Sequence, residues 1–280
     1  MASSKSSERS AIPPALGAPE WLDRARFRGH RGGLISTHRA LARFVLQPRD
    51  LFASFALVVL LSVAWLAALP FVCRLWRLVF TAGGRILALD ATVGSTERHL
   101  TAYFRFVIPF PRVESVAPGA TLWWSVAIAV LVLFAASFLL TDHYLPLAYL
   151  LRAALCVQAS ALAYFAWSPA RFPHTASGYL EGMVSYGIVL ISFVPALFGL
   201  TYFIFDFSLA RRALLTSMTM THLCLFIPLQ ALLHAAILHA SISFMPVLYI
   251  VFGLPLDILI VIAFYSWAMS WPAKTGRAKF

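Results

Sequence analysis

The stretch FGLPLDILIV, residues 252–261, places a carboxylate inside one of the most apolar parts of the chain. Asp257 follows Pro255 by two residues and Gly253 by four, and its other near neighbours are hydrocarbon. Proline removes a backbone donor from a helix and clashes with the carbonyl four residues back. The stretch therefore predicts a helix that breaks at Gly253 and Pro255. Asp257 then lies in the first turn of the second half, where free N–H groups favour negative charge.

The composition of the whole chain identifies lipid as the solvent of this helix. The 280 residues are 61% hydrophobic and 12% charged, and the mean hydropathy is +0.81. Soluble domains carry roughly 45–50% apolar and about 25% charged residues. Because a water-soluble fold cannot bury this much apolar surface, we expect an all-α integral membrane protein, a polytopic bundle.

Six segments are long enough to cross a hydrocarbon layer, which requires about 20 apolar residues. The predicted spans are residues 51–72, 121–141, 145–167, 178–204, 213–239 and 243–267. They leave a basic tail (1–50), an extracytoplasmic loop or cap (73–120), a bundle of five spans (121–267) and a second basic tail (268–280).

Lys and Arg residues indicate the orientation, because they resist translocation. With six spans, the N-terminal tail, Arg211, Arg212 and the C-terminal Lys274 fall on one side. We therefore expect both termini to be cytoplasmic, although Arg85, Arg98, Arg105 and Arg112 in the large loop weaken the contrast. The basic N-terminus lacks the features of a cleaved signal, which favours a bacterial inner membrane. The net charge of +11 gathers at the membrane edges, so it predicts anionic lipid headgroups as partners and not nucleic acid.

Two polar regions carry patterns of their own. LISTHRALARFVLQP, residues 34–48, predicts a basic amphipathic helix along the cytoplasmic headgroups. In the large loop, apolar side chains alternate from Leu100 to Ile108 with the period of a strand, and RILALDATV, residues 85–93, is a candidate partner strand. The loop is too short for an independent soluble domain, so we expect a small cap.

The fourth predicted span carries a stripe of small residues at alternating steps of four and three. In lipid, helices associate through close approach of their backbones, so such a stripe predicts a packing face. That face meets either the protein's own bundle or a partner protein. Its members are Gly178, Gly182, Ser185, Val189, Ser192, Ala196 and Gly199.

Depth along the predicted helices suggests partners for Asp257. If the last two spans form a hairpin that turns near Ala240, His222 and Asp257 reach similar depths, and Arg152 comes close to the same layer. Because ionisable groups in a membrane cost about 2.5–3.5 kcal/mol on insertion scales, we expect Asp257 to face the interior and pair with His222 or Arg152. In the alternative, the last span begins only at Leu254, and Asp257 caps it near the outer interface.

Patterns for metals, cofactors and catalysis are weak. His222, His234 and His239 fall on different faces of one helix, so they cannot share a metal ion. A single histidine could still ligate a haem or a pigment, but no cofactor is indicated. The cysteines form no CxxC pair, and no HExxH, GxSxG, GxGxxG or P-loop pattern is present, so an enzyme is not predicted.

These observations lead to two functional expectations. The first is a non-catalytic subunit or scaffold of a larger membrane complex, with other membrane proteins as partners. The second is a small proton-coupled transporter or channel that uses the broken sixth helix, with Asp257, His222 and Arg152. A third and weaker reading is a membrane enzyme for lipid-linked substrates, for which the polar residues are too scattered.

Overall fold

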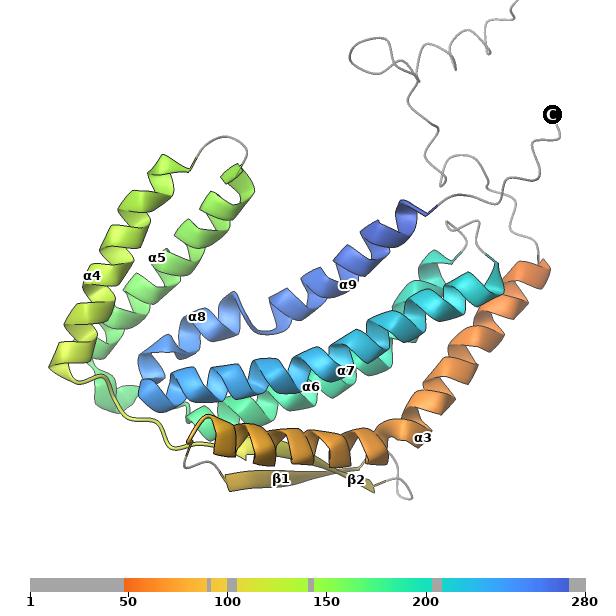
Figure 1. The fold of residues 1–280 in the computed structure, drawn as a ribbon, viewed down its shortest axis with the longest axis horizontal. Coiled ribbons are helices and arrows are strands. Elements are labelled where there is room, and N and C mark those ends of the chain that lie inside the picture. Colours follow the sequence, from red (N-terminus) through yellow and green to blue (C-terminus); the bar gives the residue numbers. More distant parts are fainter. Residues whose placement is uncertain (1–47, 90–91, 100–104, 141–143, 203–207, 272–280) are drawn as a thin grey trace, which may run out of the picture. The chain divides into compact units, whose positions relative to one another are not determined.

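The computed structural model describes residues 48–89, 92–99, 105–140, 144–202 and 208–271. The amphipathic helix expected before Pro48 and the C-terminal basic tail lie outside these residues. The described part is mostly helical (Figure 1). Its helices are α3 (Pro48–Ile86), α4 (Ala120–Ala136), α5 (Leu145–Trp167), α6 (Ala176–Thr201), α7 (Leu209–Ala240), α8 (Met245–Ile250) and α9 (Leu254–Met269), and its strands are β1 (Thr92–His99) and β2 (Arg105–Arg112).

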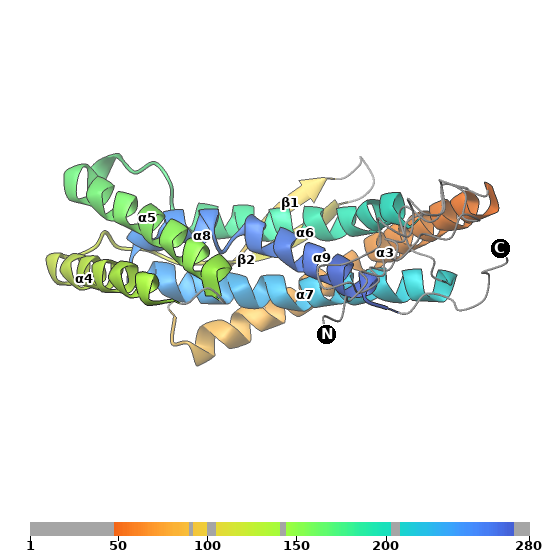
Figure 2. The ribbon, with the colours of Figure 1, turned by 90° about the horizontal axis from the view of Figure 1, so that it is seen from above.

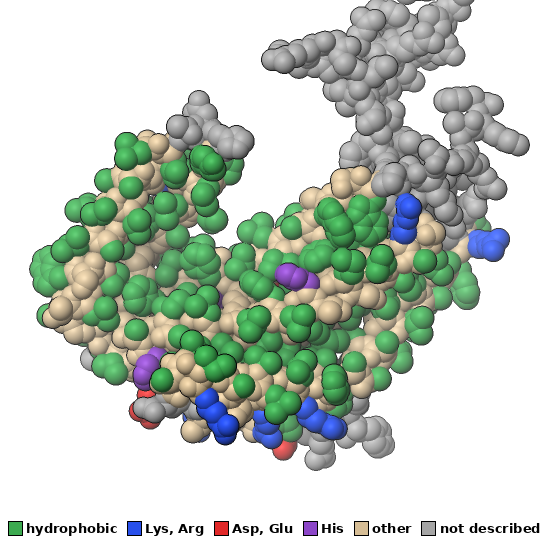
Figure 3. Space-filling model, in the orientation of Figure 1, with side chains coloured by type: hydrophobic (Ala, Val, Ile, Leu, Met, Phe, Trp, Pro, Cys, Tyr) green, Lys and Arg blue, Asp and Glu red, His purple; other side chains and the backbone are tan. Residues whose placement is uncertain are grey.

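Within the described residues, six helical stretches are long and apolar enough to cross a membrane, as the sequence predicted. Hydrophobic side chains predominate among the side chains visible on the helices in Figure 3, whereas Arg side chains gather along the lower edge and near the upper right end. Large apolar side chains stay exposed along most of these helices. In water such exposure would be costly, and in lipid it is the expected state. The candidate spans are Leu51–Ile86, Ala120–Leu139, Leu145–Trp167, Ala176–Thr201, Leu209–Ala240 and Ile242–Met269.

The first helix is longer than the sequence predicted. It continues past residue 72 to Ile86 and has 39 residues, or about 58 Å at about 1.5 Å per residue. The extension is amphipathic: Cys73, Trp76 and Phe80 are buried, and the arginines between them point away from the core. Pro70 lies inside the helix, and α3 changes direction along its length in Figure 1. The basic residues thus mark the exposed face of a continuing helix rather than its end.

Trp76 fixes this extension to α7, and its loss should be measurable. The side chain is fully buried, and its indole Nε1 donates a hydrogen bond to the carbonyl of Cys224 over 2.8 Å. Trp76→Phe leaves that carbonyl without its partner, so we expect a loss of about 1–3 kcal/mol of stability. Trp167→Phe is the matched control, because Trp167 is 89% exposed. Thermal unfolding in detergent measures both, and equal effects would show that the hydrogen bond contributes nothing.

The two strands form an antiparallel hairpin that runs from the pair Thr92↔Arg112 to the pair His99↔Arg105. Phe106, Ile108 and Phe110 of β2 are buried in the same apolar core as side chains of α3 and α6. Figures 1 and 2 show where the hairpin lies in the fold. Residues 105–108 of the predicted alternation belong to β2, whereas residues 100–104 lie outside the described residues, and the partner strand is residues 92–99 and not residues 85–93. The first two residues of RILALDATV complete α3, which ends at Ile86, and Ala88 follows in the left-handed region with φ 49°.

The core face of α6 is bulky and lies beside the stripe of small residues. Its fully buried side chains include Leu180, Val184, Ile191 and Val194. One end of the small-residue stripe meets α3, where Ser192 accepts a hydrogen bond from Trp65 over 2.8 Å and Gly199 lies against Val58. At the other end Gly178 is exposed, and a Cβ at Gly182 would meet only Tyr186, at 4.0 Å. The stripe therefore packs against α3 over part of its length and stays open over the rest.

Candidate functional site

The last membrane segment is interrupted between α8 and α9 (Figure 1). The last residue of α8 is Ile250, and α9 begins at Leu254 with Pro255 in its first turn. A Cβ at Gly253 would lie 2.8 Å from the carbonyl oxygen of Tyr249, so glycine alone permits this close approach of the two backbone segments. Asp257 follows in the first turn of α9, and its amide donates to the Gly253 carbonyl over 3.4 Å. The sequence pattern and the observed interruption coincide here.

Four polar side chains from three helices surround this interruption, and we call them the break cluster. They are Tyr179 of α6, Gln230 and His234 of α7, and Asp257 of α9. Gln230, His234 and Asp257 are 5%, 1% and 3% exposed. Polar groups this deeply buried require partners, because an unpaired one costs about 1–3 kcal/mol.

Tyr179 and His234 satisfy each other. The Tyr179 hydroxyl lies 2.9 Å from His234 Nδ1, and the two rings are stacked with centroids 5.9 Å apart. Tyr249 of α8 closes the group, with its ring centroid 6.2 Å from that of Tyr179. The first turn of α6, the end of α7 and α8 are thereby held together by aromatic packing and one hydrogen bond.

The amide of Gln230 is oriented by the interruption itself. Its Nε2 donates to the carbonyl of Phe252, one of the residues between α8 and α9. Flipping the amide would place oxygen against oxygen, so the orientation follows from the hydrogen bond. Oε1, on the same planar group, has no hydrogen-bond partner among the described residues. A buried acceptor therefore remains unsatisfied beside the break.

Asp257 supplies a second unsatisfied acceptor. Its Oδ1 has no hydrogen-bond partner, and no described Lys, Arg or His forms an ion pair with it. The hydroxyl of Tyr179 interacts electrostatically with this carboxylate. A carboxyl group in such apolar surroundings is a rare and functionally suggestive feature of membrane proteins.

The residues expected to pair with Asp257 lie elsewhere. Arg152 holds the α4–α5 hairpin: its Nε and Nη2 donate to Oγ and the carbonyl of Ser137, each over 3.0 Å, and its guanidinium lies 4.2 Å from the Phe138 ring centroid. His222 is exposed and packs against the rings of Phe226 and Phe264. Neither residue belongs to the break cluster.

His222 and Asp257 lie at different levels along the helix axes, and the register of the last two membrane segments explains why. Phe264, not Asp257, lies beside His222, with ring centroids 5.3 Å apart. Asp257 precedes Phe264 by seven residues, which is about 10 Å of helix and places it near the level of Gln230. The depth argument assumed a continuous helix after Ala240. The actual path spends residues on the short turn Ile242–Phe244 and on the break after Ile250, so fewer of its residues advance along the helix axis.

Apolar layers close the break cluster on both sides along α7. Toward the end of α7, Ala235 and Leu238 are fully buried in a core that also holds Leu248. In the other direction, Leu223 and Ile227 are fully buried in the main core, which also includes Val261 of α9. The cluster is therefore a polar layer enclosed between two apolar ones.

Tyr179, Gln230 and His234 were not predicted as site residues. Gln230 and His234 are four residues apart, a spacing that places both on one face of a helix and was a usable signal. Tyrosine is common at membrane interfaces, and no pattern within α6 distinguishes Tyr179 from other interfacial aromatics. Its role depends on contacts between helices, which a single sequence does not display.

The hydrogen bond between Tyr179 and His234 can be tested directly. Tyr179→Phe removes the hydroxyl and leaves His234 Nδ1 buried without its partner, so we expect a loss of about 1–3 kcal/mol of stability. Tyr186→Phe, on the same helix, is the control because Tyr186 is 57% exposed. Thermal unfolding in detergent compares the two, and an unchanged Tyr179→Phe would remove this bond from the account.

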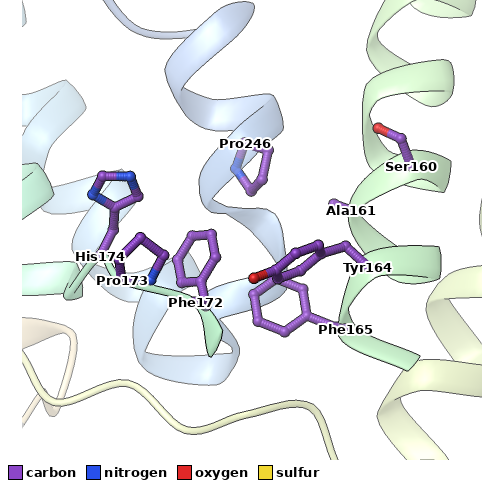
Figure 4. A pocket seen from close by; sticks show the side chains of 8 residues that line it. All are labelled: Ser160, Ala161, Tyr164, Phe165, Phe172, Pro173, His174 and Pro246. Atoms are coloured by element: carbon purple, nitrogen blue, oxygen red, sulfur yellow. The ribbon is translucent and has the colours of Figure 1, made fainter. Parts of the chain in front are cut away.

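A separate apolar pocket of about 340 Å³ lies between α5, the loop before α6, and α8 (Figure 4). Phe165, Phe172 and Pro246 form most of its wall, and Tyr164 and His174 bring polar atoms to it. Such apolar and aromatic side chains are common in membrane proteins, and none of the buried polar atoms without a hydrogen-bond partner belongs to this pocket. The break cluster is therefore the stronger candidate site.

The described residues contain no group of three His, Cys, Asp or Glu side chains that could hold a metal ion. Fold and composition define the protein as an α-helical integral membrane protein with six candidate spans. No protein-family model, curated protein or solved structure matches the chain.

Proposed function

We propose that the protein is a small membrane carrier or channel for a proton or a monovalent cation, and that its path crosses the break cluster. One observation carries the proposal: two buried oxygens, Gln230 Oε1 and Asp257 Oδ1, lack partners beside an interrupted membrane helix. Interrupted helices in transporters offer free backbone groups to ions and substrates near the middle of the bilayer. Intramembrane carboxylates commonly mark such pathways.

A purely structural role for Asp257 does not explain why its carboxylate oxygen lacks a partner. A structural carboxylate would be expected to gain stability from a salt bridge or from donors to both oxygens, because the unpaired group is costly. Ser192, Arg152 and Tyr179 of the bundle all have hydrogen-bond partners. Among the described residues, Gln158 Oε1 and Ser185 Oγ are also buried without a partner, but Asp257 is the only carboxylate among these atoms. An unpaired carboxylate beside a broken membrane helix favours a ligand-binding role.

The orientation belongs to this proposal. If all six candidate spans cross the membrane, both ends of the chain fall on one side, together with Arg211 and Arg212 at the start of α7. We assign this side to the cytoplasm of a bacterial inner membrane, in contact with anionic headgroups. The hairpin of β1 and β2 then forms the extracytoplasmic cap.

Access of water to the cluster tests the proposal. In a chain whose Cys73, Cys156 and Cys224 are replaced by alanine, a carrier should let a small charged thiol reagent reach Asp257→Cys from one side. The rate should be well below that of exposed Ser270→Cys, and fully buried Leu223→Cys should stay unlabelled. If the reagent labels Asp257→Cys from neither side of the membrane, no path crosses the cluster.

A scaffold or subunit of a larger complex is the second candidate function, and two surfaces of the protein favour it. The open end of the small-residue stripe at Gly178 and Gly182 could accept a partner helix, and none of the residues of α4 is buried. Extraction in mild detergent, followed by identification of what copurifies, tests this candidate. Stoichiometric partner proteins would favour it, whereas a chain purified alone or as a homo-oligomer would count against it.

A further inference from the structure

We propose that the break cluster binds a monovalent metal cation of the size of sodium, through Gln230 Oε1 and Asp257 Oδ1. This inference rests on the proposed function and deepens it, because it names the coupling ion. Both oxygens belong to side chains that are at least nine-tenths buried, and both lack hydrogen-bond donors.

The available atoms suit a hard cation. Amide, carboxylate and backbone oxygens are the ligands that sodium receives at unwound membrane helices. The Gln230 amide is anchored to the Phe252 carbonyl, so its Oε1 lies beside the unwound segment. The Tyr179 hydroxyl, which shares a hydrogen bond with His234 Nδ1, interacts electrostatically with the Asp257 carboxylate.

The single negative charge of the break cluster favours a monovalent ion over a divalent one. Asp257 is the single acidic member of the cluster, and no described basic side chain forms an ion pair with it. Glu181, the other acidic residue of the described spans, is engaged with the cap through Thr96 Oγ1 at 2.9 Å. A monovalent cation neutralises one carboxylate, whereas a divalent ion leaves a net positive charge buried between apolar layers, which is costly.

The competing occupant is a proton on Asp257. A protonated carboxyl donates one hydrogen bond and requires no further oxygens, so its binding does not depend on the Gln230 carbonyl group in the same way. Replacement of Gln230 by an apolar side chain of similar length should therefore abolish cation binding while leaving protonation of Asp257 possible. Gln230 is thus the residue that distinguishes the two occupants.

Binding of ²²Na⁺ to the purified full chain in detergent is the experiment. Wild type should bind the ion saturably, with displacement by NaCl and none by choline chloride. Gln230→Leu should weaken binding at least tenfold. Gln158→Leu is the matched control, because Gln158 is equally buried and also has an unpartnered Oε1. Its Nε2 donates to the carbonyl of Ser243, which precedes α8, whereas Gln230 contacts the residues that follow α8. Thermal unfolding verifies that each variant is folded.

The outcomes separate this inference from the proposed function. Absence of saturable sodium binding to folded wild type overturns the cation site, and a proton flux in liposomes would then leave the carrier in place. An equal loss of sodium binding in Gln158→Leu and Gln230→Leu also overturns the site. Sodium binding without any ion flux supports the site and contradicts the carrier.

Discussion

Asp257→Asn should abolish gradient-driven ion flux through the protein in liposomes while leaving it folded. Asparagine keeps the shape of the side chain and removes its charge, so the cluster loses the group that attracts a cation or carries a proton. We expect the flux to fall at least about tenfold, which corresponds to about 1.4 kcal/mol on the barrier. The folded fraction should be preserved, because removal of a buried unpaired charge does not cost stability.

Glu181→Gln is the matched control for this flux. It removes the other acidic group of the described spans, whose carboxylate accepts from Thr96 of the cap and lies outside the break cluster. Its flux should resemble that of wild type. An Asp257→Asn protein that conducts as well as wild type would exclude the carboxylate from the path, and equal losses in both variants would point to a general effect of acidic charge.

The second large effect concerns the contact between α6 and α7. Gly187→Leu should strongly destabilise the bundle, because even a Cβ at this position would lie 2.8 Å from two carbons of Ile227, which is itself fully buried. Overpacking a core costs about 1–3 kcal/mol for a few methylenes, and a leucine here adds four carbons between two helices. We expect a loss at the top of this range or above it, measured as the temperature at which half of the detergent-solubilised protein aggregates.

Gly182→Leu provides the comparison on the same helix. A Cβ at Gly182 meets nothing closer than Tyr186 at 4.0 Å, so the added side chain finds room and improves helix propensity. Its melting temperature should stay close to that of wild type. If both substitutions destabilise equally, the packing of α6 differs from the arrangement described, or a partner helix occupies the open end of the stripe.

Strong one-dimensional patterns predicted the membrane class and the spans. Six runs of apolar residues coincide with six candidate spans, because lipid requires about 20 apolar residues per crossing regardless of tertiary contacts. The pair Gly253 and Pro255 likewise coincides with the end of α8 and the start of α9. Both features depend on local chemistry, so a sequence displays them.

Features that depend on register were not predictable in the same way. Counting residues from the turn near Ala240 predicts that Asp257 lies level with His222, but the short 3-10 turn and the break in the last segment shift Asp257 to the level of Gln230. The basic residues of α3 hid a helix that continues to Ile86, since Trp76 and Phe80 are buried on its other face. Contacts such as Tyr179 with His234 arise from helix packing, which composition and spacing leave open.

Ion flux through the isolated chain tests the central claim most directly. The protein is purified from mild detergent, placed alone in liposomes with an imposed gradient of protons or of sodium, and followed with a pH dye or with ²²Na⁺. We predict uptake well above that of protein-free liposomes for one of the two ions, and its loss in Asp257→Asn. If the folded chain conducts neither ion, and stoichiometric partners accompany it during extraction, the protein is a subunit and the break cluster is part of its packing.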